Sequence, residues 1–240
     1  MPFTDRQVLV VGGTSGIGAG IAHGFLQAGA QVTLTGATAP EVDRARGDPM
    51  LAGAQMQVLD VRQAEQVQAC VAQFQRLDVL VNCAGVIRRG QEHDPEVFAQ
   101  VIDINLQGTM RVCTAARALL AQSQGCIVNT ASMLSFFGGG LVPAYSASKG
   151  AVAQLTKSLA IAYAPDAIRV NAIAPGWIAT PLTQALQDDE ARAAVILGRT
   201  PMARWGTPAD VAGPVLFLAS SAAAFVTGVV LPVDGGYLIT

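Results

Sequence analysis

Short apolar runs alternate along the chain with longer segments in which apolar residues recur every three or four positions. The short runs are rich in β-branched residues and predict strands, whereas the longer segments predict amphipathic helices. The predicted strands are Gln7–Val11, Gln31–Thr35, Gln55–Leu59, Asp78–Asn82, Cys126–Thr130, Ile168–Ile173 and Val229–Val233. The predicted helices are Gly16–Ala28, Ala64–Phe74, Pro95–Ala121, Ala144–Tyr163 and Pro208–Ser220, with a short helix and loops over Gly36–Gly53.

Strands that alternate with helices need crossover connections, and these favour a parallel sheet. Strands that are apolar at nearly every position are typical of a sheet that is covered on both faces. No linker, low-complexity run or fixed-period repeat divides the sequence. The pattern predicts an α/β fold: one doubly wound Rossmann-type domain over residues 1–240, with a seven-stranded parallel sheet and helices on both faces. The half up to about residue 130 is expected to bind a cofactor, and the other half to carry catalytic and substrate groups.

Composition narrows the classes of function. The 240 residues are 51% hydrophobic and 13% charged, which suits a large core and argues against disorder. A net charge of −2 without a basic run gives nucleic-acid binding little support. The four cysteines form no C-x-x-C pair and lie in apolar segments, so we expect free thiols in a reducing cytoplasm and no metal site. These cysteines are Cys70, Cys83, Cys113 and Cys126.

Two segments bear on the location of the protein. The apolar run after Asp5 and Arg6 is too short for a signal peptide. The stretch Val211–Val233 has no charged residue and is long enough to span a bilayer, but Pro214, Pro232 and several polar residues interrupt it. A buried helix, a turn and a buried strand explain this stretch better. We therefore expect a cytoplasmic protein without a membrane partner.

A glycine-rich turn, Gly12-Gly13-Thr14-Ser15-Gly16-Ile17-Gly18, follows the first predicted strand and opens the first predicted helix. Strand, turn and helix in this order form the context of a dinucleotide site. Gly12 permits the tight turn, Gly16 lets the backbone approach a pyrophosphate, and Gly18 lets the helix pack closely on the strand. The start of the helix then offers free N–H groups to the diphosphate. Taken alone, the pattern also fits a turn that serves packing only.

Tyr145 and Lys149 stand four residues apart in a predicted helix, so they share one helix face. A phenol with a pKa of about 10 is a poor base at neutral pH, and a nearby cation favours its ionised form. Lys149 supplies such a cation, which would make Tyr145 a general acid for reduction and a general base for oxidation. Ser132 follows the carboxyl end of a strand, where its hydroxyl can bind a substrate oxygen. An ordinary exposed helix pair is the alternative.

Taken together, the motifs resemble those of the short-chain dehydrogenase/reductase family nearly from end to end. The matching pieces are Gly12–Gly18, Asn82-Cys83-Ala84-Gly85, Asn105, Ser132, Tyr145-x-x-x-Lys149, Pro175-Gly176 with Thr180, and Val233-Asp234-Gly235-Gly236. Two departures are Val11 in place of threonine and Cys83 in place of a second asparagine, and neither removes a catalytic atom. The resemblance implies an oxidoreductase that interconverts a secondary alcohol and a ketone with NAD or NADP.

The resemblance also implies roles for individual residues. The implied catalytic tetrad is Asn105, Ser132, Tyr145 and Lys149, in which Asn105 holds a water that links to the lysine. Beyond the glycine-rich turn, the implied cofactor contacts are Asp60, Val61, Asn82, Ala84, Gly85, Tyr145, Lys149, Pro175, Gly176, Ile178 and Thr180. The choice between NAD and NADP stays open, because the second strand ends without an acid for the ribose hydroxyl or an arginine for a phosphate. Family members are usually tetramers packed through two long helices and the C-terminal segment, so a homotetramer is expected.

Three further segments, Ile87-Arg88-Arg89, Ala131–Phe136 and Gly198–Gly206, resemble one branch of the family. That branch contains the gluconate 5-dehydrogenases and the 2-dehydro-3-deoxy-D-gluconate 5-dehydrogenases, which act on C6 sugar acids. Arg88, Arg89 and Arg204 are candidates for binding the substrate carboxylate, because arginine pairs with carboxylates through two hydrogen bonds. A solvated Arg88–Arg89 pair and a purely anchoring Arg204 are the alternatives. Other functions left open are a 3-oxoacyl carrier-protein reductase, another ketone reductase, and a cofactor-binding regulator without catalysis.

Overall fold

The computed structural model describes residues 3–240, and in them one parallel sheet runs in the order β3-β2-β1-β4-β5-β6-β7. All six neighbouring strand pairs are parallel. The strands are β1 (Gln7–Val11), β2 (Gln31–Gly36), β3 (Gln55–Val58), β4 (Val79–Asn82), β5 (Cys126–Thr130), β6 (Arg169–Pro175) and β7 (Val230–Val233). The predicted α/β fold with a seven-stranded parallel sheet is confirmed.

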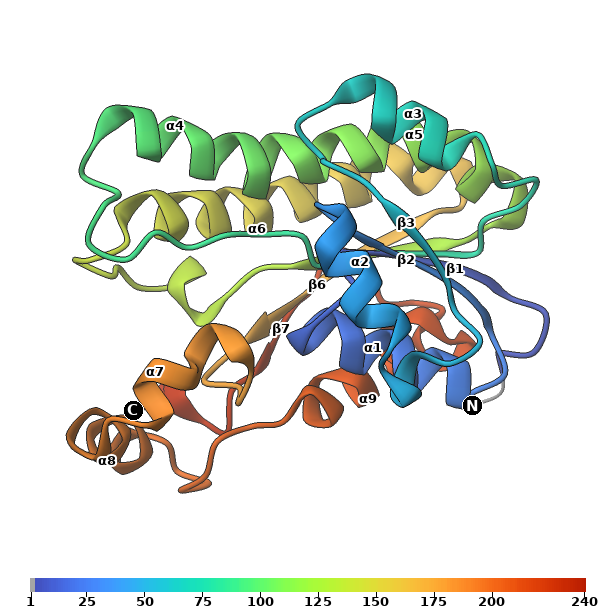
Figure 1. The fold of residues 1–240 in the computed structure, drawn as a ribbon. Helices are drawn as coiled ribbons and strands as arrows, with labels where there is room; N and C mark the ends of the chain where they lie inside the picture. Colours follow the sequence, from blue (N-terminus) through green and yellow to red (C-terminus); the bar gives the residue numbers. More distant parts are fainter. Residues whose placement is uncertain (1–2) are drawn as a thin grey trace.

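Helices cover both faces of this sheet (Figure 1). In that view four helices lie above the sheet, namely α3, α4, α5 and α6. Helices α1 and α9 lie beneath it. The α-helices are α1 (Gly16–Gln27), α2 (Ala39–Arg46), α3 (Ala64–Val71), α4 (Pro95–Ile102), α5 (Thr109–Ser123), α6 (Pro143–Tyr163), α7 (Gln184–Gln187), α8 (Glu190–Arg199) and α9 (Pro208–Ala219). The elements predicted from the sequence do not include α7 and α8, which lie beside the C-terminus and away from the sheet.

The central strand β1 divides the core into two layers. Val8 and Val10 pack in a cluster with residues of α1 and α9, whereas Leu9 and Val11 pack in a second cluster with residues of α3, α5 and α6. This alternation follows from the two-residue period of a strand. Each fully buried aliphatic side chain stabilises the fold by roughly 1.5–3 kcal/mol, so both faces demand apolar residues. The strand therefore reads as a continuous apolar run.

The predicted helix Pro95–Ala121 is interrupted. A π-helical segment, Asp103–Gly108, joins α4 to α5 and places the fully buried Asn105 in its middle. The apolar period continues through this segment, which is why the sequence predicts one regular helix. Single π-helical turns often mark functional positions, and this one lies under the carboxyl end of β4.

The order of the strands creates a crevice between β1 and β4. The chain moves outward from β1 to β2 and β3 and then returns to β4 on the other side of β1. The connections after β1 and β4 diverge at this point, and open α/β sheets bind their ligands there. The glycine-rich turn follows β1 and the segment Ala84–Gly85 follows β4, so both border the crevice.

The uncharged stretch Val211–Val233 consists of most of α9, a short 3-10 turn (Ser221–Ala223) and β7. The prediction of a helix, a turn and a strand is confirmed. Across residues 3–240, every helix is too short or too polar to cross a lipid bilayer.

Candidate active site

The glycine-rich turn connects β1 to α1 with a backbone that side chains would obstruct. Gly12 has a φ of +79°, and a Cβ atom built on it would lie 2.5 Å from the backbone nitrogen of Ala84. Gly16 has a φ of +54°, and a Cβ on Gly18 would overlap the carbonyl oxygen of Gly12. Glycine is therefore required at these positions. The first N–H groups of α1 stay open to a close anion, so the turn fits the diphosphate of a dinucleotide.

The loop after β6 reaches over this turn. A Cβ on Gly16 would meet the side chain of Thr180 at 3.4 Å. A Cβ on Gly176 would meet the Cα atom of Asp234 at 2.7 Å, so the loop packs closely against the segment after β7. Pro175, the last residue of β6, pairs with Val233 of β7. Ile178 is buried and pairs with a later segment at Gly206. Of these predicted cofactor contacts, Thr180 lies nearest to the glycine-rich turn.

The other predicted cofactor residues follow β3 and β4 at the same edge of the sheet. The Arg62 side chain donates hydrogen bonds to both carboxylate oxygens of Asp60 and thereby holds the pKa of that carboxyl below its usual value. Gly85 is exposed, and a Cβ on it would lie 3.3 Å from Oδ1 of Asn105 and 3.5 Å from Nζ of Lys149. The positions at this edge are Asp60, Val61, Asn82, Ala84 and Gly85. Gly85 therefore lies beside Asn105 and Lys149, two of the candidate catalytic residues.

Asn82 points into the fold and braces the end of β4. Its Nδ2 donates to Oδ1 of Asn129 at 2.9 Å and to Sγ of Cys113 at 3.3 Å. Asn129 in turn donates to Oγ1 of Thr156 at 3.0 Å. This buried polar chain ties β4 to β5, α5 and α6, and so fixes the sheet edge beside the crevice.

The four catalytic candidates come together where β5 and α6 meet. Nζ of Lys149 lies 5.6 Å from the centre of the Tyr145 ring and donates to the carbonyl oxygen of Thr130 at 2.7 Å. Lys149 is only 4% exposed. Ser132 is buried just after β5, and its hydroxyl lies close enough to the Tyr145 phenol to lower its pKa. Phenol, hydroxyl and ammonium thus share one small polar site.

Asn105 links the π-helical segment to both sides of this site. Its Nδ2 donates to the carbonyl oxygen of Val86 and to Oγ of Ser148, both at 3.0 Å, and its Oδ1 accepts from the N–H of Val86 at 2.8 Å. Ser148 donates to the carbonyl oxygen of Tyr145 at 2.7 Å. The side chain of Asn105 therefore has protein partners on all sides. The water contact that the family resemblance implies stays a prediction.

Burial changes the pKa values of both Tyr145 and Lys149. Burial raises the pKa of the Tyr145 phenol, the Ser132 hydroxyl offsets part of this rise, and the negative charge of Glu92 adds to it. The spacing of Tyr145 and Lys149 predicted a pKa of the phenol below its ordinary value, whereas burial raises it in the structure. Burial also lowers the pKa of Lys149 to about 8, and the interaction with nearby Cys83 opposes part of this decrease. At neutral pH most Lys149 side chains therefore keep their positive charge.

Two acids near the site are not predicted from the sequence. Glu92 is buried and accepts hydrogen bonds from the N–H groups of Arg88 and Tyr145. Glu41 accepts from the N–H of Ala37 at 2.8 Å, so a carboxylate does lie at the carboxyl end of β2. Neither acid carries a signal in the sequence, because each stands in a polar segment that looks solvated.

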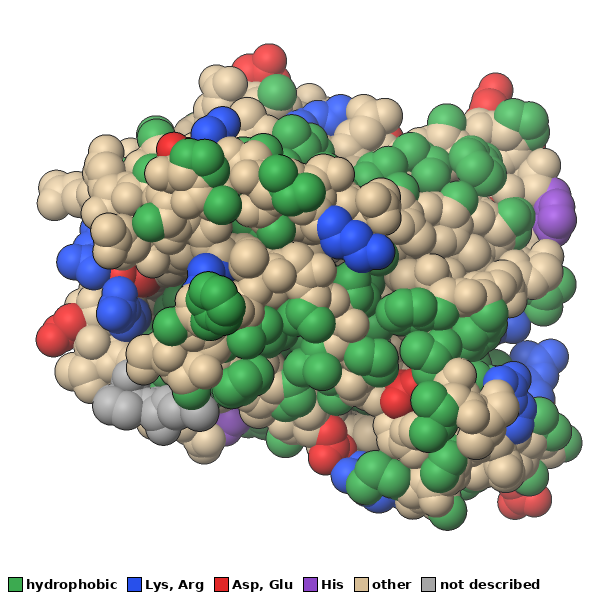
Figure 2. All heavy atoms as spheres, turned by 180° about the vertical axis from the view of Figure 1, so that it is seen from behind, with side chains coloured by type: hydrophobic (Ala, Val, Ile, Leu, Met, Phe, Trp, Pro, Cys, Tyr) green, Lys and Arg blue, Asp and Glu red, His purple; other side chains and the backbone are tan. Residues whose placement is uncertain are grey.

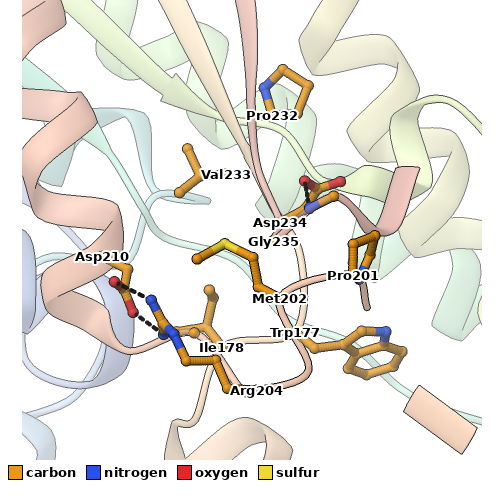
Figure 3. Close-up of a pocket in the computed structure, with 12 residues that line it drawn as sticks. Trp177, Ile178, Pro201, Met202, Arg204, Asp210, Pro232, Val233, Asp234 and Gly235 are labelled. Atoms are coloured by element: carbon orange, nitrogen blue, oxygen red, sulfur yellow. Dashed lines mark hydrogen bonds and ion pairs between the residues drawn. The ribbon is translucent and has the colours of Figure 1, made fainter. Parts of the chain in front are cut away.

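The three candidate substrate arginines differ in their partners. Arg88 and Arg89 are exposed, and within residues 3–240 their guanidinium groups form no ion pair. Arg204 donates to both carboxylate oxygens of Asp210 at 2.7 and 2.9 Å (Figure 3). This pairing holds the pKa of the Asp210 carboxyl well below its usual value. The geometry favours an anchoring role for Arg204, whereas Arg88 and Arg89 are available for a ligand.

A cavity of about 560 Å³ opens beside the Arg204–Asp210 pair (Figure 3). Trp177 and Ile178 line it from the loop after β6, and Met202 lines it from the segment after α8. Tyr145 and Lys149 are not among its lining residues. We therefore do not place the reacting substrate there.

The glycine-rich turn and the neighbouring polar site together define a nicotinamide-dependent oxidoreductase of the dinucleotide-binding class. The family model described as "Enoyl-(Acyl carrier protein) reductase" matches residues 11–238. The chain belongs to the short-chain dehydrogenase/reductase family, whose members use NAD or NADP.

Several relatives align over nearly their whole length. The chain is 41% identical to a 2-dehydro-3-deoxy-D-gluconate 5-dehydrogenase of Pseudoalteromonas atlantica, over 97% of this chain and 96% of that protein. It is 36% identical to a 5-keto-D-gluconate 5-reductase of Escherichia coli, over 99% of this chain and 97% of that protein. A crystal structure from Agrobacterium tumefaciens with bound NADP, assigned as a 2-deoxy-D-gluconate 3-dehydrogenase, superimposes with a TM-score of 0.90. It is 40% identical and covers 100% of this chain and 98% of that one.

Proposed function

We propose that this enzyme interconverts a secondary alcohol and a ketone on a C6 sugar acid, such as gluconate or 2-dehydro-3-deoxy-D-gluconate. The observation that carries the proposal is the placement of Arg88 and Arg89. Their guanidinium groups are exposed and unpaired within the described part of the chain, on a loop hydrogen-bonded through Glu92 to the backbone of Tyr145. Relatives named for such substrates support the same substrate class.

The chain's own residues account for the proton transfer. Tyr145 gives its phenolic proton to the substrate oxygen during reduction and takes a proton from it during oxidation. Ser132 donates a hydrogen bond to the same oxygen as negative charge develops there. The Lys149 ammonium, which is charged at neutral pH, stabilises the ionised phenol. Asn105 fixes the start of α6 through Ser148 and so keeps the phenol in place.

The cofactor would be held by the groups along the crevice. The diphosphate fits the N–H groups at the start of α1, and Thr180 and Gly85 lie on the path from this turn toward Lys149. When bound, the nicotinamide supplies or accepts the hydride. Glycine at position 85 leaves room between the crevice and the catalytic side chains, because any Cβ there would approach Asn105 and Lys149.

The arginine pair would hold the substrate carboxylate. Arginine binds carboxylates with two parallel hydrogen bonds, which add geometry as well as charge. A sugar acid needs this clamp because its reacting carbon must be held at about 3–3.5 Å from the hydride donor. A small neutral ketone lacks the carboxylate and would gain little from the pair.

The test compares two substrate classes in Arg88→Ala and Arg89→Ala. We expect kcat/KM for the sugar acid to fall by about 1.5–3 kcal/mol in at least one variant, which is the range for hydrogen bonds to charged groups. Activity on a small neutral ketone should change little. Arg46→Ala is the matched control, because Arg46 is an exposed arginine on α2 that pairs with Asp43. Equal losses for both substrates would reveal a structural arginine pair, and failure of every sugar acid would remove the substrate assignment.

We further propose that the enzyme works as a homotetramer in the cytoplasm. The long helices expose hydrophobic side chains, among them Phe98 on α4, Met110 on α5 and Ile161, which is 78% exposed, on α6. An apolar groove of about 440 Å³ lies between Met110 and Leu155. Broad hydrophobic patches with few charges also cover the rear face (Figure 2). Surfaces of this kind suit contact between copies of the chain, and a monomer in light scattering at micromolar concentration would contradict this assembly.

A further inference from the structure

Glu92 is a buried carboxylate that joins two segments of the active site. It is 1% exposed, although it stands in a polar loop between β4 and α4. Its Oε1 accepts from the N–H of Arg88 and its Oε2 accepts from the N–H of Tyr145, both at 2.8 Å. Each oxygen therefore holds the backbone of a residue that the proposed reaction uses. A buried charge is costly, so its retention needs such compensation.

The compensation comes from backbone groups. Within residues 3–240 no lysine, arginine or histidine forms an ion pair with Glu92. Tyr145 is the third residue of α6, and the residue before that helix, Val142, gives no side-chain cap. Glu92 thus satisfies an N–H group that the helix itself leaves free, and it lies at the positive end of the helix dipole. The carboxylate caps the catalytic helix from a distant loop.

The whole loop is fastened to the segment that precedes α6. The N–H of Gly90 donates to the carbonyl oxygen of Leu141 at 2.8 Å, and Nε2 of His93 lies 3.0 Å from the carbonyl oxygen of Gly140. These bonds and those of Glu92 hold the loop along the start of α6. The position of the Arg88 backbone relative to the Tyr145 backbone is therefore fixed by a small set of hydrogen bonds, and the Glu92 side chain bonds to the N–H groups of both residues.

We propose that Glu92 is a positioning residue that sets the phenol of Tyr145 and the substrate-binding loop at Arg88 in a fixed relation to one another. The part of this inference that concerns Arg88 rests on the proposed sugar-acid substrate, whereas the part that concerns Tyr145 does not. Glu92 touches neither the substrate oxygen nor the hydride, and it acts through the two backbones that it holds.

The charge of Glu92 adds a second effect. Its negative charge raises the pKa of the Tyr145 phenol. The other groups that face this phenol are Lys149 from α6 and Ser132 after β5, with Cys83 at the end of β4 beside the lysine. Removal of the charge leaves those groups in place, so the pH at which Tyr145 ionises should fall.

The test replaces the carboxylate by its closest neutral shape. In Glu92→Gln one amide oxygen can still accept an N–H, but the amide NH₂ must face the other N–H and cannot accept it. We expect kcat to fall roughly 10-fold to 100-fold from the displaced phenol, and the pH profile of kcat to move to lower pH by on the order of 0.5 unit. KM for the sugar acid should rise, while the Kd of the free enzyme for NADH, followed by nucleotide fluorescence, should stay the same.

Two further variants separate this role from a structural one. Asp94→Asn is the matched control, because Asp94 caps α4 in the same loop and asparagine caps helices equally well. It removes the same charge and should leave kcat, KM and the pH profile unchanged. Glu92→Asp keeps the charge but is shorter, so we expect a lower kcat with an unshifted pH profile. If the Glu92→Gln variant does not fold, the kcat of Glu92→Asp still tests the positioning role of the side chain.

The outcomes for the two substrate classes are distinct. The shift of the pH profile should appear with a small neutral ketone as well, because Tyr145 serves both substrates, whereas the rise in KM should appear with the sugar acid only. If no sugar acid is turned over, the proposed function fails and the ketone profile still tests Glu92. A glutamine variant with reduced melting temperature but wild-type kcat, KM and pH profile would show that Glu92 only stabilises the fold, and would overturn the inference.

Discussion

The substitution Lys149→Met should remove activity and change how stability depends on pH. Lys149 is buried, and burial lowers the pKa of its ammonium from 10.5 to about 8. Well above pH 10.5 the side chain is neutral in both the folded and the unfolded chain, so the pKa shift does not change the free energy of unfolding. As pH falls through 10.5, the unfolded chain takes up a proton first and is thereby stabilised. Below pH 8 Lys149 is protonated in the folded chain too, and the decrease in the free energy of unfolding has reached its full size.

The size of this penalty follows from the shift. A difference of about 2.5 pKa units corresponds to about 3 kcal/mol at pH 7, and to roughly 1 kcal/mol at pH 10. Methionine carries no charge and escapes the penalty at every pH. It also leaves the carbonyl oxygen of Thr130 without its hydrogen bond, which costs about 1–3 kcal/mol at every pH. The variant should therefore be about as stable as the wild type, or more stable, at pH 7 and less stable at pH 10.

The assay is urea unfolding of both proteins at equal concentration, at pH 7, 8, 9 and 10. The difference in unfolding free energy between variant and wild type is the quantity of interest, because titrating groups that are distant from Lys149 cancel in it. Lys157→Met controls for the loss of a positive charge from the same helix, since Lys157 is exposed. A Lys149→Met difference that stays constant from pH 7 to pH 10 would refute the reasoning, because a buried ammonium must produce a slope.

Three further expectations concern other parts of the site. Tyr145→Phe should bind NADH as the wild type does but lose on the order of 10²–10⁴-fold in kcat, because the phenol alone carries the transferable proton; near wild-type turnover would disprove this role. Gly12→Ala should destabilise the fold by at least about 2 kcal/mol in urea unfolding, because it combines a positive φ with a backbone clash at Ala84. Glu41→Gln should tighten NADPH binding relative to NADH, because it removes a negative charge at the carboxyl end of β2, and an unchanged ratio of the two Kd values would count against it.

The sheet could be predicted from the sequence because its signal is local. Buried parallel strands favour apolar residues at successive positions, so β1 appears directly as the apolar run over residues 8–11, and glycine marks the turn that follows it. The limits of the strands were less exact, since β6 extends to Pro175. The predicted elements do not include α7 and α8, which lie outside the sheet layers. The four-residue α7 is too short to show an apolar period and buries none of its side chains, whereas the longer α8 buries only Ile196.

The candidate catalytic side chains could be proposed from their motif, but their surroundings could not be predicted. The spacing of Tyr145 and Lys149 requires one helix face, whereas their pKa values depend on burial by segments far away in the sequence. Glu92 shows the same limit more sharply. An acid in a polar loop predicts solvent exposure, and only the docking of that loop on α6 reveals a buried cap. Tertiary contacts of this kind have no sequence period.

The π-helical segment Asp103–Gly108 makes the site sensitive to the length of the chain as well as to the identity of Asn105. A π turn contains one residue more than a regular helix needs, so deletion of a single residue there would restore regular hydrogen bonding without loss of the helix. Everything on the N-terminal side would then rotate by about 100° relative to α5. Different side chains of α4 would then face α6, and Asn105 would lose its alignment with Val86 and Ser148. A one-residue deletion would thus abolish activity although all four tetrad residues remain. Point substitutions, which keep the length of the chain, would not reveal this dependence.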